Sequence, residues 1–320
     1  MNGALIISLD FELLWGVFDN VNYNDKIEYF HNTREVVPKI LQLFEKYEIS
    51  CTWATVGMLF NENWEEWNEN IPGTLPGYEN KELSAYRFGR SIQNKETESL
   101  CFAPNLIRKI QQTSRQEIAT HTYSHYYCLE QGQNSDSFKA DLKLAVKMAQ
   151  AFDVELRSLV FPRNQFNREY LEICKNLEIR NVRSNPTNWY WKDTGKDSLL
   201  NKIFRTGDAY VGSTNKSYNL EELPNRRNEP LSQKASRLLR PFSPNQTLNS
   251  LKIKRIKQEM TKAAKNAEVY HLWWHPHNFG DFPAENLRDL EELLIHYKHL
   301  KEEFDFQSLN MQEIEQLFVG

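Results

Sequence analysis

Short apolar segments alternate with longer amphipathic segments along nearly all of the 320-residue chain. The short segments resemble β-strands in length and composition, and the longer ones have the apolar spacing of helices. This alternation favours βα units, whose strands pair in parallel within one sheet. The predicted strands are Ala4–Asp10, Cys51–Gly57, Gln116–Thr120, Leu156–Pro162, Arg180–Arg183, Lys202–Thr206 and Glu268–Trp274, with Phe304–Leu309 as a candidate eighth. Helices are predicted near 33–47, 137–151, 167–177, 249–266 and 284–302.

Two segments interrupt the alternation. Residues 61–82 hold six Glu, two Trp and two Pro, and we interpret the region near 61–100 as an insertion, with a surface loop favoured over a lid. Residues 234–265 carry nine Lys or Arg against one Glu. We expect a solvated helix face in this basic segment, and the alternative is a basic rim that meets phosphate groups.

Composition excludes several classes of protein. The net charge of −4 provides no basic field for nucleic acid. The four cysteines form no C-x-x-C pair, so we expect buried thiols rather than a zinc ribbon. Residues 1–8 lack a basic region and a long apolar run, so we expect neither a signal peptide nor a transmembrane segment, and a cytoplasmic location.

Five of the eight histidines fall in two short patches, "ATHTYSHYYC" and "VYHLWWHPHNFG", each at the end of a predicted strand. Reactive groups converge at the carboxyl ends of barrel strands. The first strand ends at the same rim, where a period of two places Asp10 and Glu12 on one face. Burying a carboxylate there costs roughly several kcal/mol unless the carboxylate is paired or binds a metal.

His121 and His125 are close enough in sequence for both imidazoles to contact one ion. H-x-x-x-H alone is weak evidence. Two histidines with one carboxylate and an open position for water are typical of a catalytic metal site. With no HExxH glutamate nearby, Asp10 is the available base.

The sequence resembles the polysaccharide deacetylase family, carbohydrate esterase family 4, and within it a signal-less branch associated with surface-polysaccharide biosynthesis. The likeness rests on "SLDFELLWG", "EIATHTYSHYYCLEQGQ", "SLVFPRNQFN", "NVRSNPTNWYW" and "HLWWHPHNFG", which follow the family's order along almost the whole chain. The resemblance implies a distorted (β/α)7 barrel, an Asp-His-His site usually filled by zinc, and hydrolysis of an N-acetyl group on an amino sugar.

By that resemblance, Asp10 matches the catalytic base, and His121 and His125 match the metal ligands. His275 matches the general acid, and Arg163 lies in the motif that shapes the active-site groove.

The chain departs from the family pattern twice. The second acid is Glu12 rather than an aspartate adjacent to Asp10, so the carboxylate ligand is Glu12, Asp10 or Asp19. Arg163 follows the motif's proline instead of preceding it, which makes Arg183 a second candidate for orienting the base.

Aromatic and basic residues near these motifs are candidates for substrate contact, namely Tyr126, Trp189, Trp273, Arg183 and His277. For His271 we favour a core histidine, and the alternative is a residue that supports the site from behind.

Because Asp10 and His275 must meet in one site, we predict one barrel rather than two domains over residues 1–320, and the resemblance implies that it is a single distorted (β/α)7 TIM-like barrel. The predicted activity is metal-dependent N-deacetylation, most simply with Zn²⁺, of an amino sugar or glycan that is nucleotide- or lipid-linked. The alternatives are hydrolysis of a small non-sugar amide and a degenerate carbohydrate-binding protein.

Overall fold

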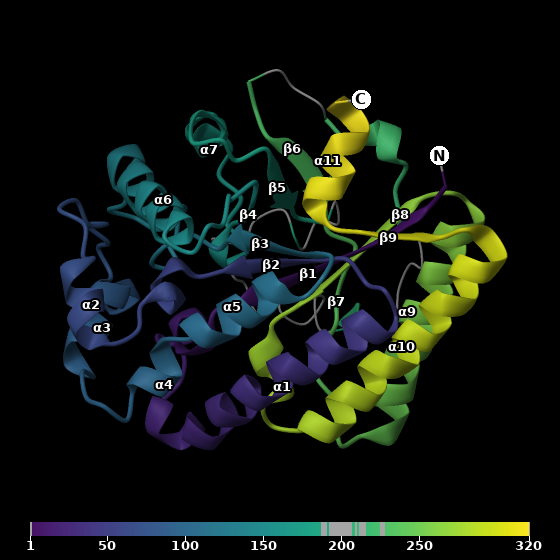
Figure 1. Cartoon of the computed structure of the whole chain (residues 1–320), viewed down its shortest axis with the longest axis horizontal. Coiled ribbons are helices and arrows are strands. Elements are labelled where there is room, and N and C mark those ends of the chain that lie inside the picture. Colours follow the sequence, from purple (N-terminus) through teal and green to yellow (C-terminus); the bar gives the residue numbers. More distant parts are fainter. Residues whose placement is uncertain are drawn as a thin grey trace.

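A parallel sheet forms the centre of the molecule (Figure 1). The computed structural model describes residues 2–186, 191, 207–208, 210, 216–224 and 228–319, so the predicted strand Lys202–Thr206 lies outside the described residues. The strands are β1 (Ala4–Phe11), β2 (Cys51–Thr55), β3 (Gln116–Thr120), β4 (Ser158–Val160), β5 (Asn181–Ser184), β6 (Leu231–Lys234), β7 (Arg237–Leu238), β8 (Val269–Trp274) and β9 (Gln307–Leu309). They pair in parallel in the order β6-β5-β4-β3-β2-β1-β8-β7, and β9 pairs with the start of β1.

The segment that contains β6 and β7 connects the two ends of this sheet. The backbone N–H of Ala235 donates to Ser184 O at the end of β5, and that of Ser236 donates to His271 O in β8. Two adjacent residues therefore bond to opposite ends of the strand order. Counting this bent segment as one strand, and β9 as an accessory to β1, gives the distorted (β/α)7 barrel that was predicted. The sequence did not reveal β6 or β7, because both are short and polar.

Helices cover the outside of the sheet (Figure 1), with α1, α9 and α10 side by side. Their bounds are α1 (Ile27–Lys46), α2 (Trp64–Glu69), α3 (Ala85–Ser91), α4 (Glu98–Cys101), α5 (Pro104–Gln112), α6 (Ser135–Gln150), α7 (Leu171–Asn176), α9 (Gln246–Lys265), α10 (Pro283–Phe304) and α11 (Met311–Val319). The five predicted helices are confirmed with shifted ends. None of the helices among the described residues is long and apolar enough to cross a bilayer.

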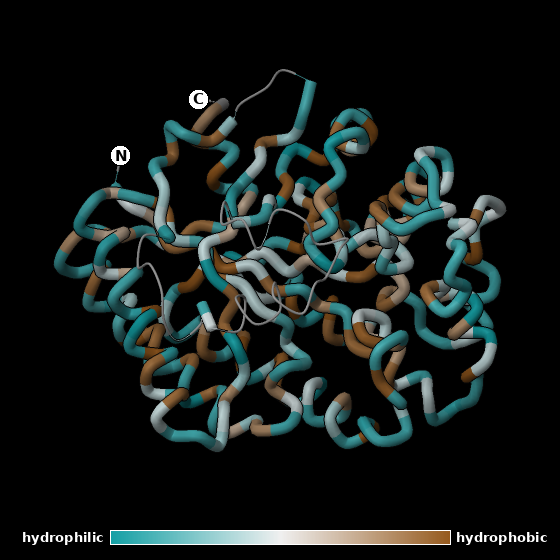
Figure 2. The backbone as a smooth tube through the Cα atoms, turned by 180° about the vertical axis from the view of Figure 1, so that it is seen from behind, coloured by the Kyte–Doolittle hydropathy of each residue, from teal (hydrophilic) through white to brown (hydrophobic). Residues whose placement is uncertain are grey.

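The two faces of β1 have different chemistry. Leu5, Ile7 and Leu9 belong to the main apolar core. Ser8 and Asp10, on the other face, are buried and hydrogen-bonded to side chains from other strands. The barrel interior is therefore polar at the level of these residues, whereas the layer between strands and helices is apolar. Hydrophilic segments dominate the outer loops (Figure 2).

The inserted segment packs firmly against the rest of the protein. The ring of Trp67 in α2 stacks on Trp15, with 6.1 Å between centroids. The hydroxyl of Tyr78 accepts a hydrogen bond of 2.8 Å from the backbone N–H of Tyr127, two residues after His125. The segment therefore lies against residues 121–127, the turn that carries His121 and His125 and is called the histidine turn.

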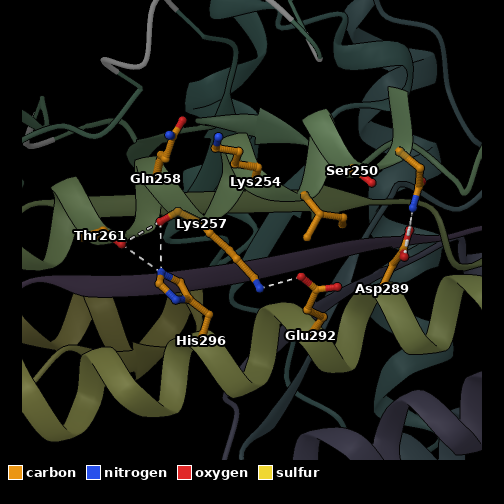
Figure 3. A pocket seen from close by; sticks show the side chains of 10 residues that line it. Ser250, Lys254, Lys257, Gln258, Thr261, Asp289, Glu292 and His296 are labelled. Atoms are coloured by element: carbon orange, nitrogen blue, oxygen red, sulfur yellow. Dashed lines mark hydrogen bonds and ion pairs between the residues drawn. The ribbon is translucent and has the colours of Figure 1, made fainter. Parts of the chain in front are cut away.

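Several side chains of the basic segment pair with acids within the protein, namely Arg237, Lys252, Arg255 and Lys257. Arg237, Lys252 and Arg255 are buried, so the predicted solvated face is wrong for them. In the groove between α9 and α10, Lys257 pairs with Glu292 at 2.6 Å, and Asn249 bonds Asp289 (Figure 3). Lys252 also pairs with Asp289, at 3.2 Å. These contacts join the two helices and give Lys252 and Lys257 acidic partners within the protein. The four cysteines are free and buried, as predicted.

Candidate metal and catalytic site

The ends of three strands bring together the acidic and histidine motifs. Glu12 follows β1, His121 follows β3, and His275 follows β8. Since β1 lies between β2 and β8, and β3 pairs with β2, these ends lie along one rim of the barrel. The sequence prediction that the two histidine patches meet the first strand's acids is confirmed.

Glu12, His121 and His125 form a compact group of potential metal ligands. Glu12 Oε2 lies 3.3 Å from His121 Nε2 and 3.1 Å from His125 Nε2. Among the described residues, these three form the one group of His, Cys, Asp or Glu whose ligand atoms all lie within 4.8 Å of one another. Tetrahedral zinc with ligand distances of roughly 2.0–2.2 Å places its ligand atoms about 3.3 Å apart. The spacing therefore fits a zinc-sized ion.

The hydrogen bonds around these side chains also fit a cation. His121 Nδ1 lies 2.9 Å from the carbonyl oxygen of Val160, which can only accept, so Nδ1 carries the proton. Its Nε2 then directs either a lone pair or a second proton at Glu12. His121 Nε2 and Glu12 Oε2 are buried and make no hydrogen bond. A cation between them satisfies both atoms, since it accepts lone pairs from imidazole and carboxylate alike.

Burial and the neighbouring histidines shift the pKa of Glu12 in opposite directions. Burial raises the pKa of this carboxyl, but the neighbouring imidazoles of His275, His125 and His121 hold it well below its ordinary value. Burial lowers the pKa of His125, against the raising effect of Glu12. A carboxylate beside a neutral imidazole is the protonation state that metal binding requires.

The histidine turn is built by local strain and by a helix residue. Thr122 and His125 have φ of 63° and 55°, a region that costs of order 1 kcal/mol or more for non-glycine residues. Asp141 in α6 accepts hydrogen bonds from the backbone N–H groups of Tyr123 and Ser124 and from the Ser124 hydroxyl, which holds the turn in place. Burial raises the pKa of Asp141 to about 6, although these hydrogen bonds lower it. Sequence reasoning missed Asp141, because nothing local marks a helical aspartate as a contact of this turn.

Asp10 forms a bidentate ion pair with Arg183. Both guanidinium-to-carboxylate distances are 2.7 Å, and Arg183 also donates to the Ser8 hydroxyl. Burial raises the pKa of Asp10, but Arg183, His121 and His275 together outweigh it, and the net pKa is lowered. Asp10 is thus held as a carboxylate that still has a lone pair on each oxygen.

The late histidines approach the two acids from β8. His275 Nε2 lies 3.6 Å from Asp10 Oδ2 and 3.7 Å from Glu12 Oε1, and its side chain is 26% exposed. His277 is buried, with Nδ1 3.6 Å from Glu12 Oε1 and no hydrogen bond. Burial lowers the pKa of His277 to about 4. His275 is therefore the histidine of this group that a substrate can reach, and His277 lies behind it.

The structure corrects the prediction that Arg163 orients the base. Arg163 pairs with Asp19 and stacks on the ring of Tyr127, 4.2 Å from its centroid. Arg183, the second candidate, contacts Asp10 instead. The reason is register: Val160 in β4 pairs with Arg183 in β5, which places that guanidinium inside the barrel, whereas Arg163 follows β4 in a turn with φ of 55°. Asp19 is paired with Arg163 and is absent from the group of potential ligands.

The predicted substrate contacts need revision. The Tyr126 hydroxyl bonds Gln133, Asn134 and Ser137 at the start of α6, so it faces the helix rather than the site. Arg183 is buried against Asp10, and its guanidinium covers Trp273 at 4.3 Å from the ring centre, which leaves neither available to substrate. Trp189 lies outside the described residues. His271 is buried and bonds Ser8 at 2.8 Å, behind Asp10, which is the alternative that the sequence left open.

Comparisons with known proteins agree with this architecture. The structure resembles a Mycobacterium smegmatis protein assigned as a polysaccharide deacetylase, with a TM-score of 0.61, 12% identity, and coverage of 100% of this chain and 92% of that chain. A Pseudomonas aeruginosa PAO1 protein with the same assignment gives 0.56, 8% identity, and coverage of 98% and 89%. The PuuE allantoinase gives 0.54, 10% identity, and coverage of 98% and 88%. At these identities the structural matches establish the fold alone, and no curated protein sequence matches the chain.

The sequence profile described as polysaccharide deacetylase matches residues 17–182, just over half of the chain. The matched range includes His121, His125 and Arg163, and the fold brings Asp10, Glu12 and His275 to the same rim. On this evidence, the chain belongs to the polysaccharide deacetylase family.

Proposed function

We propose that this protein is a metal-dependent hydrolase that removes an N-acetyl group from an amino sugar. Family membership supports an amide hydrolase acting on a sugar substrate. The observation that carries the proposal is the buried group of Glu12, His121 and His125, with its unpartnered Glu12 Oε2 and His121 Nε2, next to Asp10 and the accessible His275. Zn²⁺ is the proposed metal, because two imidazoles and one carboxylate suit it and leave a position open.

In this proposal, Glu12, His121 and His125 hold the metal, which when bound supplies Lewis-acid activation of water and of the amide carbonyl. Asp10 accepts the proton of the attacking water, and Arg183 fixes both carboxylate oxygens in place. His275, across a 3.6 Å gap from Asp10, donates a proton to the sugar nitrogen as the C–N bond breaks. The products are acetate and the free amine.

We further propose a nucleotide- or lipid-linked amino sugar as substrate and surface-polysaccharide assembly in the cytoplasm as the setting. The likeness of the motifs to the signal-less branch of the family supports this assignment. Four free, buried cysteines are in keeping with a reducing compartment.

The test combines metal analysis with acetate release. We expect about one zinc per chain, as in a mononuclear site of this kind, which His121→Ala removes and His296→Ala leaves unchanged. His296 lies in the α9–α10 groove and serves as the matched control (Figure 3). Asp10→Asn should keep the metal and lower the rate of acetate release about 10²–10⁴-fold, the usual contribution of a general base.

The substrates to compare are UDP-N-acetyl amino sugars, lipid-linked amino sugars, N-acetylated oligosaccharides and allantoin. Acetate release from one of the sugar classes supports the proposal. A folded protein that binds no divalent metal, or that hydrolyses allantoin and none of the sugars, contradicts it.

A further inference from the structure

A chain of side chains leads from His125 away from Glu12. His125 Nδ1 lies 3.2 Å from the Tyr127 hydroxyl, and that hydroxyl lies 3.4 Å from Asp19 Oδ1. Arg163 pairs with the other carboxylate oxygen of Asp19 and covers the face of the Tyr127 ring. Both Tyr127 and the Asp19 side chain are buried, so water does not replace these contacts.

The order of donors in this chain follows from Asp19. A carboxylate paired with a guanidinium can only accept, so the Tyr127 hydroxyl donates to Asp19. Its oxygen then presents a lone pair to His125 Nδ1, which must donate. The proton of the neutral ring therefore sits on Nδ1, and Nε2 directs its lone pair toward Glu12 Oε2, 3.1 Å away.

We infer that Tyr127 and Asp19, with Arg163 holding Asp19, are positioning residues that fix the tautomer and orientation of His125 for metal binding. The inference rests on the proposed function, in that it assumes His125 is a metal ligand. His121 obtains the same tautomer from the Val160 carbonyl, so each histidine has its own acceptor behind it. Groups in this position commonly change metal affinity by about 10–100-fold when removed.

Three tyrosines within five residues of one another provide matched controls for the role of Tyr127. Tyr123, Tyr126 and Tyr127 are all buried in the same turn, but the hydroxyls of Tyr123 and Tyr126 bond Asn61 and the start of α6. Tyr127→Phe should raise the Zn²⁺ dissociation constant about 10–100-fold. Tyr126→Phe and Tyr123→Phe should change it less than about twofold, within the usual scatter of such measurements.

Affinity is measured by competition with a chromophoric chelator, and Co²⁺ absorption spectra show whether the ligand geometry has changed. Long-range ¹⁵N–¹H correlation spectra of the metal-free protein should show His125 with its proton on Nδ1 in the wild type and a mixture of tautomers in Tyr127→Phe. Asp19→Ala should weaken Zn²⁺ binding in the same direction, and Asp19→Asn, which retains an acceptor, should restore part of it.

Equal Zn²⁺ affinity in Tyr127→Phe and Tyr126→Phe overturns the inference, as does an Nε2-protonated His125 in the metal-free wild type. If the wild-type protein binds Zn²⁺ but releases no acetate, the proposed function fails, and the ratio of affinities still decides the inference. If it binds no metal, both fail.

Discussion

Glu12 and Glu259 are both almost fully buried, but their surroundings in this fold are opposite. Glu259 accepts two hydrogen bonds from Arg237, at 2.6 and 2.7 Å, and a third from Tyr270 at 2.8 Å. Glu12 faces four histidine nitrogens at 3.1–3.7 Å, and its Oε2 makes no hydrogen bond. Burial alone therefore does not identify a functional carboxylate.

The difference lies in what surrounds each group. The permanently charged guanidinium groups of Arg237 and Arg255 supply the counter-charge of Glu259, so this site requires no further cation. Imidazoles can be neutral, and as neutral groups they leave the charge of Glu12 without a counter-ion. A cation bound beside Glu12, as proposed above, would supply the missing counter-ion, and this would distinguish the Glu12 site from the structural ion pair at Glu259.

The largest contrast is expected from the same substitution at the two sites. Glu259→Gln leaves Arg237 buried with an incomplete partner, and should lower the free energy of unfolding by about 3–5 kcal/mol. Glu12→Gln should lower the stability of the metal-free protein less than Glu259→Gln does, because no guanidinium is left without its partner, but it should abolish stoichiometric zinc binding. Denaturant unfolding in the presence of a chelator, together with metal analysis of the folded protein, checks both.

The reverse pattern, with a destabilised Glu12→Gln variant and a stable Glu259→Gln variant, would show that Glu12 is the structural group. Retention of one zinc per chain by Glu12→Gln would contradict its assignment as the carboxylate ligand.

A second, smaller effect on zinc binding is expected at Gly16, where the absence of a side chain leaves room for the Glu12 carboxylate. A Cβ atom there would lie 2.0 Å from the Glu12 carboxyl carbon. Gly16→Ala should displace the carboxylate and weaken zinc binding about 10–100-fold, as for other changes that misplace a ligand. Gly73→Ala is the matched control, because no atom lies within 4 Å of its Cβ position. Equal zinc affinities in the two variants would show that Glu12 is not held by this contact.

The sequence was sufficient to predict the barrel and the convergence of its motifs. Parallel strands that are buried on both sides appear as apolar runs, and their carboxyl ends share one rim, so Asp10, Glu12, His121, His125 and His275 could be brought together before the structure was known. The choice between Asp10 and Glu12 could not be made, because a period of two places both on one face, and only the structure shows that the strand ends at Phe11, so that Glu12 leaves this regular alternation.

Contacts between distant elements were beyond sequence reasoning for a different reason. Arg183 meets Asp10 through the barrel interior, and Asp141 meets the histidine turn from a helix. Neither pairing leaves a local spacing that could be recognised. The same limit explains Tyr126 and Tyr127, which are adjacent and similar in sequence but direct their hydroxyls to α6 and to His125.

The smallest expected effect concerns pH and sharpens the same comparison, because His271 is a neutral imidazole enclosed beside the charged pair of Asp10 and Arg183. Burial lowers the pKa of His271 from 6.5 to about 3, and Arg183 adds to this shift. Between these values the unfolded chain binds a proton that the folded chain does not. Folding should therefore lose stability as the pH falls from 6.5 toward 3, with a slope of at most about 1.4 kcal/mol per pH unit from this group. Above pH 6.5 His271 contributes nothing to the slope.

The test is denaturant unfolding of the metal-free wild type and of His271→Gln at pH 7.5, 6 and 5. The free energy of unfolding should depend less steeply on pH in His271→Gln. Parallel curves for the two proteins would mean that His271 takes up its proton as readily in the folded state as in the unfolded one, and that the barrel interior behind Asp10 is open to water.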